Sequence, residues 1–142
     1  YLLAATDAHA KNYSIMLAAD GSHRLAPMYD VASIAPYVEG AKLKVKPPKL
    51  AMSIGGENRT GRVSANDLAK LVEQCGLERS GITAEGCRDL LALYAKEIPG
   101  KLAREFDALE KTGSADAARE LRGRMEEPIA QLCARSLKGL GS

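Results

Sequence analysis

The sequence of 142 residues contains no tryptophan, a single phenylalanine and only three cysteines. The cysteines form no Cys-x-x-Cys pair, which argues against a zinc site or a thioredoxin-like motif. We expect Cys75, Cys87 and Cys133 to be buried free thiols of a cytoplasmic protein. No apolar run comes near the roughly 18 residues that a membrane-spanning helix needs. An excess of one charge is also lacking, and the net charge of +2 gives no general attraction to nucleic acids or anionic membranes.

The chain has the ordinary composition of one globular domain, with 46% hydrophobic and 27% charged residues. It opens on Tyr1 inside an apolar stretch, so we expect it to be part of a longer protein. Three regions differ in composition. Residues 1–37 hold most of the chemically reactive side chains, residues 38–62 are rich in Lys, Gly and Pro, and residues 63–142 follow a helical period.

A small β-hairpin is predicted over residues 13–26. The first half alternates weakly, and Asp20-Gly21 is a frequent hairpin turn. Residues 24–26 would form the returning strand. This strand is expected to end at Pro27, because proline has no N–H for a ladder hydrogen bond.

Four helices are predicted from the apolar spacing in residues 63–142. Ser64 is a good N-cap for the first helix, Asp67 lies three residues on, and Gly76 is expected to end it. The later helices are expected to begin at Thr83, at Pro99 in a first turn, and at Ser114 or Asp116.

The apolar stripes of these helices are expected to form the core of the domain. Pro128 removes a hydrogen bond inside the fourth helix, so we expect a kink or a break there. The predicted core positions are Leu68, Leu71, Val72, Cys75, Cys87, Leu90, Leu91, Tyr94, Ile98, Leu102, Phe106, Leu109, Leu121, Met125, Ile129, Leu132 and Leu137.

The side chains best suited to catalysis lie between Asp7 and Asp30. Asp7 and Asn12 have the Asp-x-x-x-x-Asn spacing of the protein-kinase catalytic loop, and Asp30 follows the predicted hairpin. Phosphoryl transfer from a nucleoside triphosphate needs such a set. One carboxylate orients the attacking hydroxyl, and an amide oxygen and a second carboxylate hold Mg²⁺. Each residue also has a structural explanation, because Asp7 suits a turn or helix cap and Asp30 an Asx-turn.

Three motifs carry a more specific signal. They are Thr6-Asp7-Ala8-His9-Ala10-Lys11-Asn12-Tyr13-Ser14, Leu25-Ala26-Pro27-Met28-Tyr29-Asp30 and Leu50-Ala51-Met52-Ser53-Ile54-Gly55-Gly56. Through them the chain closely resembles the C-terminal region of HipA-like kinases, which are bacterial toxin kinases of toxin–antitoxin modules. The first two motifs are specific together, and the third is supportive. The resemblance covers essentially the whole chain.

The resemblance implies roles for three polar residues. Asp7 corresponds to the catalytic base of the family's Asp-x-His-x-x-Asn loop. Asn12 corresponds to the asparagine that binds Mg²⁺ beside the nucleotide phosphates. Asp30 corresponds to the metal-binding aspartate. The cofactors implied are therefore ATP and Mg²⁺, with Asn12 and Asp30 as metal ligands.

His9, Lys11 and Tyr29 are further cofactor-binding candidates on the same grounds, since His9 and Lys11 lie in the stretch that touches ATP in the family and Tyr29 adjoins the metal carboxylate. An imidazole donor at His9 suits the transferred phosphate, and a packed loop histidine is the alternative. Lys11 would either neutralise phosphate charge or pair with a nearby carboxylate.

We therefore predict a mainly α fold, namely a truncated kinase-like C-terminal lobe built as a helical bundle with a small N-terminal β-hairpin. The resemblance implies that the parent protein transfers the ATP γ-phosphate to a Ser or Thr of a translation-related protein. It also implies restraint by a small DNA-binding antitoxin of the HipB type, so that DNA is met only indirectly. No Gly-rich loop or strand lysine precedes Asp7 here. We expect both in a missing N-terminal lobe, and we expect the chain alone to be inactive.

Two other functions remain open from the residues. A non-catalytic helical interaction domain, such as a degenerate kinase or an antitoxin-docking module, would explain the apolar helices equally well. A nuclease or phosphatase would need a second acidic cluster, which the sequence does not suggest.

The segment of residues 38–62 carries six basic and two acidic side chains, a net charge of +4. A basic loop after the metal-binding Asp30 could steer an acidic or RNA-bound substrate, and a solvated flexible loop is the alternative. The charged residues are Lys42, Lys44, Lys46, Lys49, Arg59 and Arg62 against Glu39 and Glu57.

Overall fold

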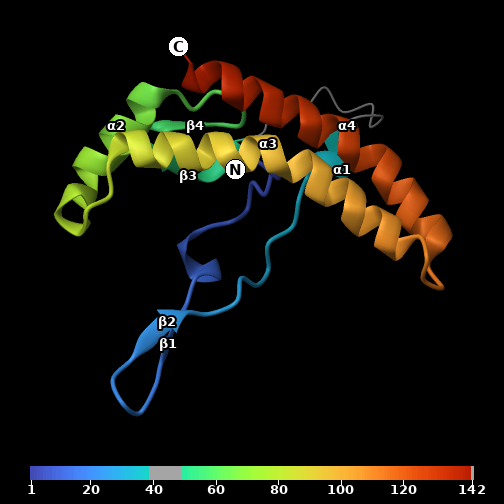
Figure 1. The fold of residues 1–142 in the computed structure, drawn as a ribbon, viewed down its shortest axis with the longest axis horizontal. Coiled ribbons are helices and arrows are strands. Elements are labelled where there is room, and N and C mark those ends of the chain that lie inside the picture. The colour runs from blue at the N-terminus through green and yellow to red at the C-terminus, as the bar shows by residue number, and fades with distance from the viewer. Residues whose placement is uncertain (39–48, 142) are drawn as a thin grey trace.

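Two long helices dominate the computed structural model, which describes residues 1–38 and 49–141. Helices α3 (Ala84–Leu109) and α4 (Ala115–Leu140) run side by side in opposite directions and arch over the rest of the chain (Figure 1). Helix α2 (Ala65–Gln74) packs against α3, and the short α1 (Ala35–Val38) packs against α4. The predicted mainly α fold is confirmed. Within the described ranges, no helix has the length and hydrophobicity needed to cross a membrane.

Helix α2 begins and ends where the sequence predicts. The Ser64 hydroxyl accepts a hydrogen bond from the Asp67 N–H at 3.3 Å, and the Asp67 carboxylate accepts one from the Ser64 N–H at 3.0 Å. Two orphan donors of the first turn are thus satisfied reciprocally. Hydrogen bonds from Ser64 to the carboxylate lower the pKa of Asp67 below its ordinary value. Gly76, at φ +61°, follows the last turn.

The predicted helix boundary at Pro99 is wrong, and so is a break at Pro128. Both prolines lie inside continuous helices of 26 residues. A proline in a helix interior costs about 3 kcal/mol, so packing must outweigh that loss. Ala95 before Pro99 and Leu102 after it contact the same apolar cluster, and Ile129 follows Pro128 directly into it. Tertiary contacts on both sides of Pro99, and directly after Pro128, therefore keep the two helices intact.

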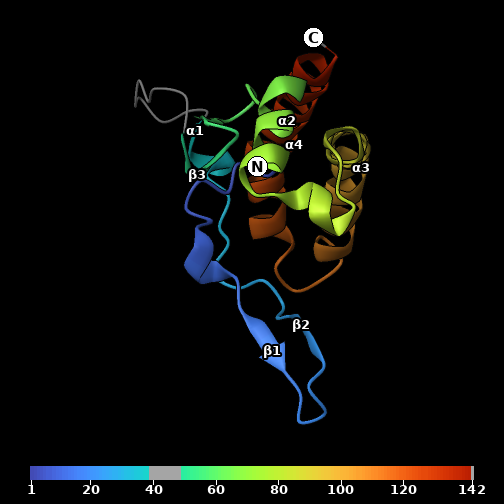
Figure 2. The same cartoon turned by 90° about the vertical axis from the view of Figure 1, so that its left-hand side faces the viewer.

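The predicted hairpin is confirmed. Strand β1 (Ile15–Leu17) pairs with β2 (His23–Leu25) in antiparallel register, with Ile15 opposite Leu25. The returning strand thus begins one residue earlier than predicted. The hairpin projects away from the helices in both views (Figures 1 and 2).

A second hairpin was not predicted. Strand β3 (Lys49–Ile54) pairs with β4 (Glu57–Arg59) across the turn at Gly55-Gly56. Gly55 has φ +57°, and a Cβ built there would lie 1.8 Å from the carbonyl oxygen of Asp67. Only glycine permits this approach between β3 and α2. Residues 39–48 of the basic segment, with three of its lysines, lie outside the described residues.

The core forms where α3 and α4 meet the N-terminal segment and α2. One cluster joins Leu2 and Ala4 to Ala95 and Ile129, and a second joins Val63, Leu68 and Leu140. Several predicted core positions are exposed instead: Cys75, Leu90, Tyr94, Leu109 and Leu121. Leu109 ends α3 and Leu121 lies near the start of α4, at the end of the pair where no other described helix or strand covers it (Figure 1).

Tyr94 and Leu91 face a different gap. An apolar cavity of about 260 Å³ separates this side of α3 from the N-terminal segment, where Tyr13 and Met28 line it.

The expectation of buried cysteines holds for Cys133 alone, because Cys75 is exposed and Cys87 half-buried. All three are free thiols, as expected. Burial raises the pKa of the Cys133 thiol.

Candidate functional site

The candidate site lies on the N-terminal segment, which backbone hydrogen bonds hold from two sides. The Thr6 carbonyl accepts a hydrogen bond from the Ala51 N–H of β3 at 2.8 Å. The Ala4 carbonyl accepts one from the Ile34 N–H at 3.1 Å. The chain just before Asp7 is therefore fixed between β3 and the segment that follows Asp30.

Asn12 connects the loop that follows Asp7 with the segment that contains Asp30. It ends a short 3₁₀ turn (Ala10–Asn12), and only 3% of its surface is exposed. Its Oδ1 accepts a hydrogen bond from the His9 N–H at 2.9 Å, and its Nδ2 donates to the Asp30 carbonyl at 3.3 Å. Both bonds satisfy an amide that would be costly to bury unpaired. The structure thus brings Asn12 and Asp30 together across 18 residues of sequence.

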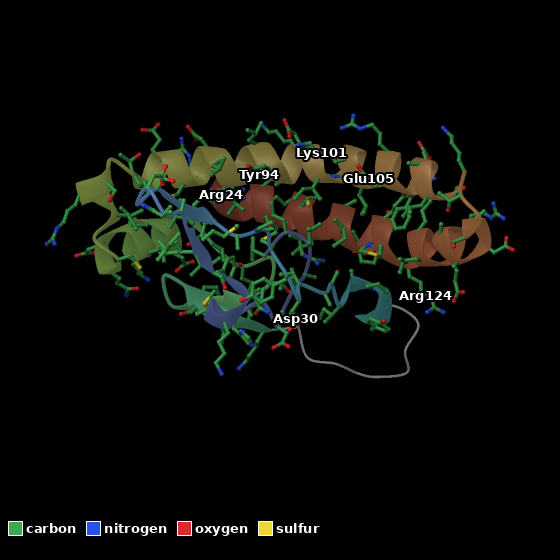
Figure 3. The ribbon with its side chains drawn as sticks, turned by 90° about the horizontal axis from the view of Figure 1, so that it is seen from below. Arg24, Asp30, Tyr94, Lys101, Glu105 and Arg124 are labelled. Carbon is green, nitrogen blue, oxygen red and sulfur yellow. The ribbon has the colours of Figure 1, made fainter. Side chains whose placement is uncertain are left out.

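Asp30 adopts an unusual backbone conformation. Its φ is +55°, in the left-handed region that aspartate tolerates better than most residues. Its side chain is exposed at the outer edge of the N-terminal segment, well away from Tyr94 on α3 (Figure 3). No ion pair or hydrogen bond from a described residue engages the Asp30 carboxylate. Among the described residues, no group therefore competes with a cation for this carboxylate.

Asp7 is exposed in the turn between Thr6 and the 3₁₀ turn. Within residues 1–38 and 49–141, its carboxylate also has no hydrogen-bond or ion-pair partner. No hydrogen bond or ion pair in this part of the chain joins Asp7 to Asn12 or Asp30. The three predicted residues thus share one segment, and a hydrogen bond joins the last two.

His9 and Lys11 flank the start of the 3₁₀ turn. His9 is half-buried, and its Nδ1 is enclosed without a hydrogen-bond partner among the described residues. Such an atom is costly unless a partner reaches it. The Lys11 side chain is exposed, and it pairs with none of the carboxylates that the structure describes. Its backbone carbonyl is engaged by Tyr29.

Tyr29 crosses from the Asp30 segment to the loop. Its hydroxyl donates to the Lys11 carbonyl at 2.6 Å and lies 2.8 Å from the Ser14 Oγ. Ser14 is a contact that the sequence reasoning missed. Its only signal was its place at the end of the first motif, two residues after Asn12.

The chemistry of the donors suits a hard cation. Asp7, Asn12 and Asp30 offer carboxylate and amide oxygens, which Mg²⁺ prefers. An amide oxygen has two acceptor sites, and the bond from His9 leaves one of them on Asn12. A cluster of three or more His, Cys, Asp or Glu side chains that could hold a metal is absent from the described residues. The acidic cluster that a nuclease or phosphatase would need is therefore not found there.

The family model of the HipA-like C-terminal domain matches residues 1–129. The chain belongs to this family. The match includes the three motifs, the candidate site and all of α3, and it ends inside α4. A HipA-like C-terminal domain carries a toxin–antitoxin context, which agrees with the resemblance found from the motifs. The roles predicted for individual residues stay predictions.

Proposed function

We propose that this HipA-like domain is the C-terminal lobe of a serine/threonine protein kinase of the toxin type. The parent protein would transfer the ATP γ-phosphate to a Ser or Thr of a protein of the translation machinery. A small DNA-binding antitoxin of the HipB type would restrain it. Asp7 is the catalytic base in this proposal and accepts the proton of the attacking hydroxyl.

One observation supports this proposal above the others, namely the hydrogen bond from the Asn12 side chain to Asp30. It holds the Asn12 amide beside the backbone of Asp30, whose carboxylate has no partner among the described residues, and this nearness supports a shared Mg²⁺ site. Asn12 and Asp30 would hold this ion, which when bound neutralises charge on the ATP phosphates. A domain that only binds other proteins gives no reason for this arrangement.

His9 and Lys11 would serve the phosphates. The Nδ1 of His9 has no hydrogen-bond partner in the described part of the chain, and an imidazole N–H suits a phosphate oxygen as acceptor. The ammonium of Lys11, which pairs with no described carboxylate, adds positive charge on the exposed side of the turn. Both groups act by stabilising charge on the transferred group.

The test is phosphoryl transfer by the full protein that carries this domain. Labelled γ-phosphate is followed from ATP into the proteins of a translation extract, with Asp7→Asn and Asp30→Asn compared with the unaltered protein. We expect each variant to lose a factor on the order of 10²–10⁴ in rate. Both side chains are exposed and unpaired within the described residues, so the unfolding temperature should stay unchanged.

Glu105→Gln on α3 is the matched control, because it removes one negative charge from an exposed side chain distant from Asp30 (Figure 3). It should transfer phosphate at the normal rate. If the Asp7 and Asp30 variants behave like this control, the kinase proposal is wrong. The domain would then be a non-catalytic interaction module.

A further inference from the structure

The hydroxyl of Tyr29 is shared between two groups of the loop that carries Asn12. It donates its single proton to the Lys11 carbonyl at 2.6 Å. The Ser14 hydroxyl, 2.8 Å away, must therefore donate its own proton to the Tyr29 oxygen. Tyr29 thus bonds to the loop at Lys11 and at Ser14, one on each side of Asn12.

The hydrogen bond from Asn12 to the Asp30 carbonyl lies next to these two bonds, because Tyr29 and Asp30 are consecutive. Three hydrogen bonds therefore connect residues 11–14 with residues 29–30. They hold Asp30 at φ +55°, a conformation that a free chain would seldom keep. The Asp30 carboxylate makes none of these bonds and has no partner among the described residues.

We propose that Tyr29 is a positioning residue for the metal site. Its hydroxyl fixes the spacing between the Asn12 loop and Asp30, and so sets the affinity for Mg²⁺, without contact to the ion or to the nucleotide. This inference rests on the proposed function, because it assigns Mg²⁺ to Asn12 and Asp30. It gives Tyr29 a role distinct from direct cofactor binding.

The effect should be moderate in size. Tyr29 is 46% exposed, so water can replace part of what its hydroxyl provides. Asn12 is buried and keeps its own bond to Asp30 when the hydroxyl is removed. The site should therefore loosen rather than collapse.

The experiment measures ATP binding by calorimetry at increasing Mg²⁺ concentration, on the full protein that carries the domain. Tyr29→Phe removes the hydroxyl and keeps the ring. We expect the Mg²⁺ concentration for half-maximal ATP binding to rise about fivefold to tenfold, because both hydrogen bonds of the hydroxyl are lost and water replaces part of each. Ser14→Ala leaves the bond to Lys11 intact, so its rise should be smaller, about twofold to threefold.

Tyr94→Phe on α3 is the matched control. Tyr94 is also 46% exposed, and its hydroxyl bonds to nothing within the described residues. Its variant should bind ATP with normal Mg²⁺ dependence. Amide hydrogen exchange of residues 9–14 should accelerate in Tyr29→Phe and not in Tyr94→Phe. The unfolding temperature should be the same in both.

Two results would overturn the inference in distinguishable ways. If Asp30→Asn abolishes Mg²⁺-dependent ATP binding and Tyr29→Phe leaves it unchanged, Tyr29 has no positioning role and the proposed function stands. If Asp30→Asn itself leaves binding and phosphoryl transfer unchanged, the proposed function fails and this inference fails with it.

Discussion

Different interactions stabilise the α3–α4 pair and the N-terminal segment of residues 1–38. The helices share buried apolar side chains along their contact, and Arg122 of α4 adds ion pairs to Asp107 and Glu110 at 2.7 and 3.0 Å. The hydrogen bonds to these two carboxylates raise the pKa of the Arg122 guanidinium, and the bond to Asp107 has the larger effect. The projecting hairpin of the N-terminal segment, by contrast, leaves its apolar side chains in water, and Leu17 is 80% exposed.

The difference teaches where stability and chemistry reside in this domain. The helices supply packing that does not depend on the candidate site. The site depends on a few hydrogen bonds through Asn12, Tyr29 and the Thr6 carbonyl. Substitutions in the two regions should therefore differ in how much they change the free energy of unfolding, and the substitutions below test this difference.

The largest effect on stability is expected at Ile129, which has no exposed surface and lies in the cluster between α4 and the N-terminal segment. Ile129→Ala should lower the free energy of unfolding by about 2–5 kcal/mol, through lost burial and the cavity left behind. Urea denaturation measures this. Leu121→Ala on the exposed part of the same helix should cost far less. Equal losses in the two variants would show that the core is not where we place it.

A smaller effect is expected at the start of α2. Ser64→Ala removes the hydroxyl that caps the Asp67 N–H, and should cost about 1 kcal/mol of unfolding free energy. Ser114→Ala at the start of α4 is the control, because the Ser114 side chain makes no capping bond. A larger loss in the Ser114 variant would contradict the capping assignment.

The same site predicts a pH dependence. Because the pKa of Asp67 is lowered in the folded state, its contribution to stability is present above the ordinary aspartate pKa. It is lost as the pH falls from about 4 through the folded value. The difference in unfolding free energy between the Ser64→Ala variant and the unaltered protein should therefore become smaller in acid.

The smallest effect is expected on the projecting hairpin. Leu17→Ser should change the unfolding free energy by less than about 0.5 kcal/mol, because this side chain is already in water. The matched substitution Leu132→Ser in the core should be strongly destabilising. If Leu17→Ser destabilises the full protein that carries the domain as strongly, another part of that protein covers the hairpin.

Local sequence signals predicted the features that depend on local physics. The capping pair of Ser64 and Asp67 and the turn at Asp20-Gly21 act within a few residues, so their patterns were sufficient. The order of Asn12, the first hairpin and Asp30 predicted two residues that the structure does join.

Features that depend on distant contacts could not be predicted this way. Pro99 looks like a helix start until the cluster that contacts both of its flanks is known. Strand β3 is held by its pairing with β4 and by the Thr6 carbonyl. The Gly55-Gly56 pair is a hairpin turn signal that was not used in the prediction, and no local pattern indicates the bond to Thr6. Leu90 has the spacing of a core position, yet nothing in the described part of the chain covers it.

The glycine at position 55 has a consequence for Asp7. Its backbone lies against the Asp67 carbonyl of α2. In β3, the Ala51 N–H donates a hydrogen bond to the carbonyl of Thr6, the neighbour of Asp7. Helix α2 is thus mechanically connected to the proposed catalytic base through main-chain atoms alone. A side chain at position 55 would meet the Asp67 carbonyl and separate β3 from α2, whereas the bond between Ala51 and Thr6 needs no side chain at all.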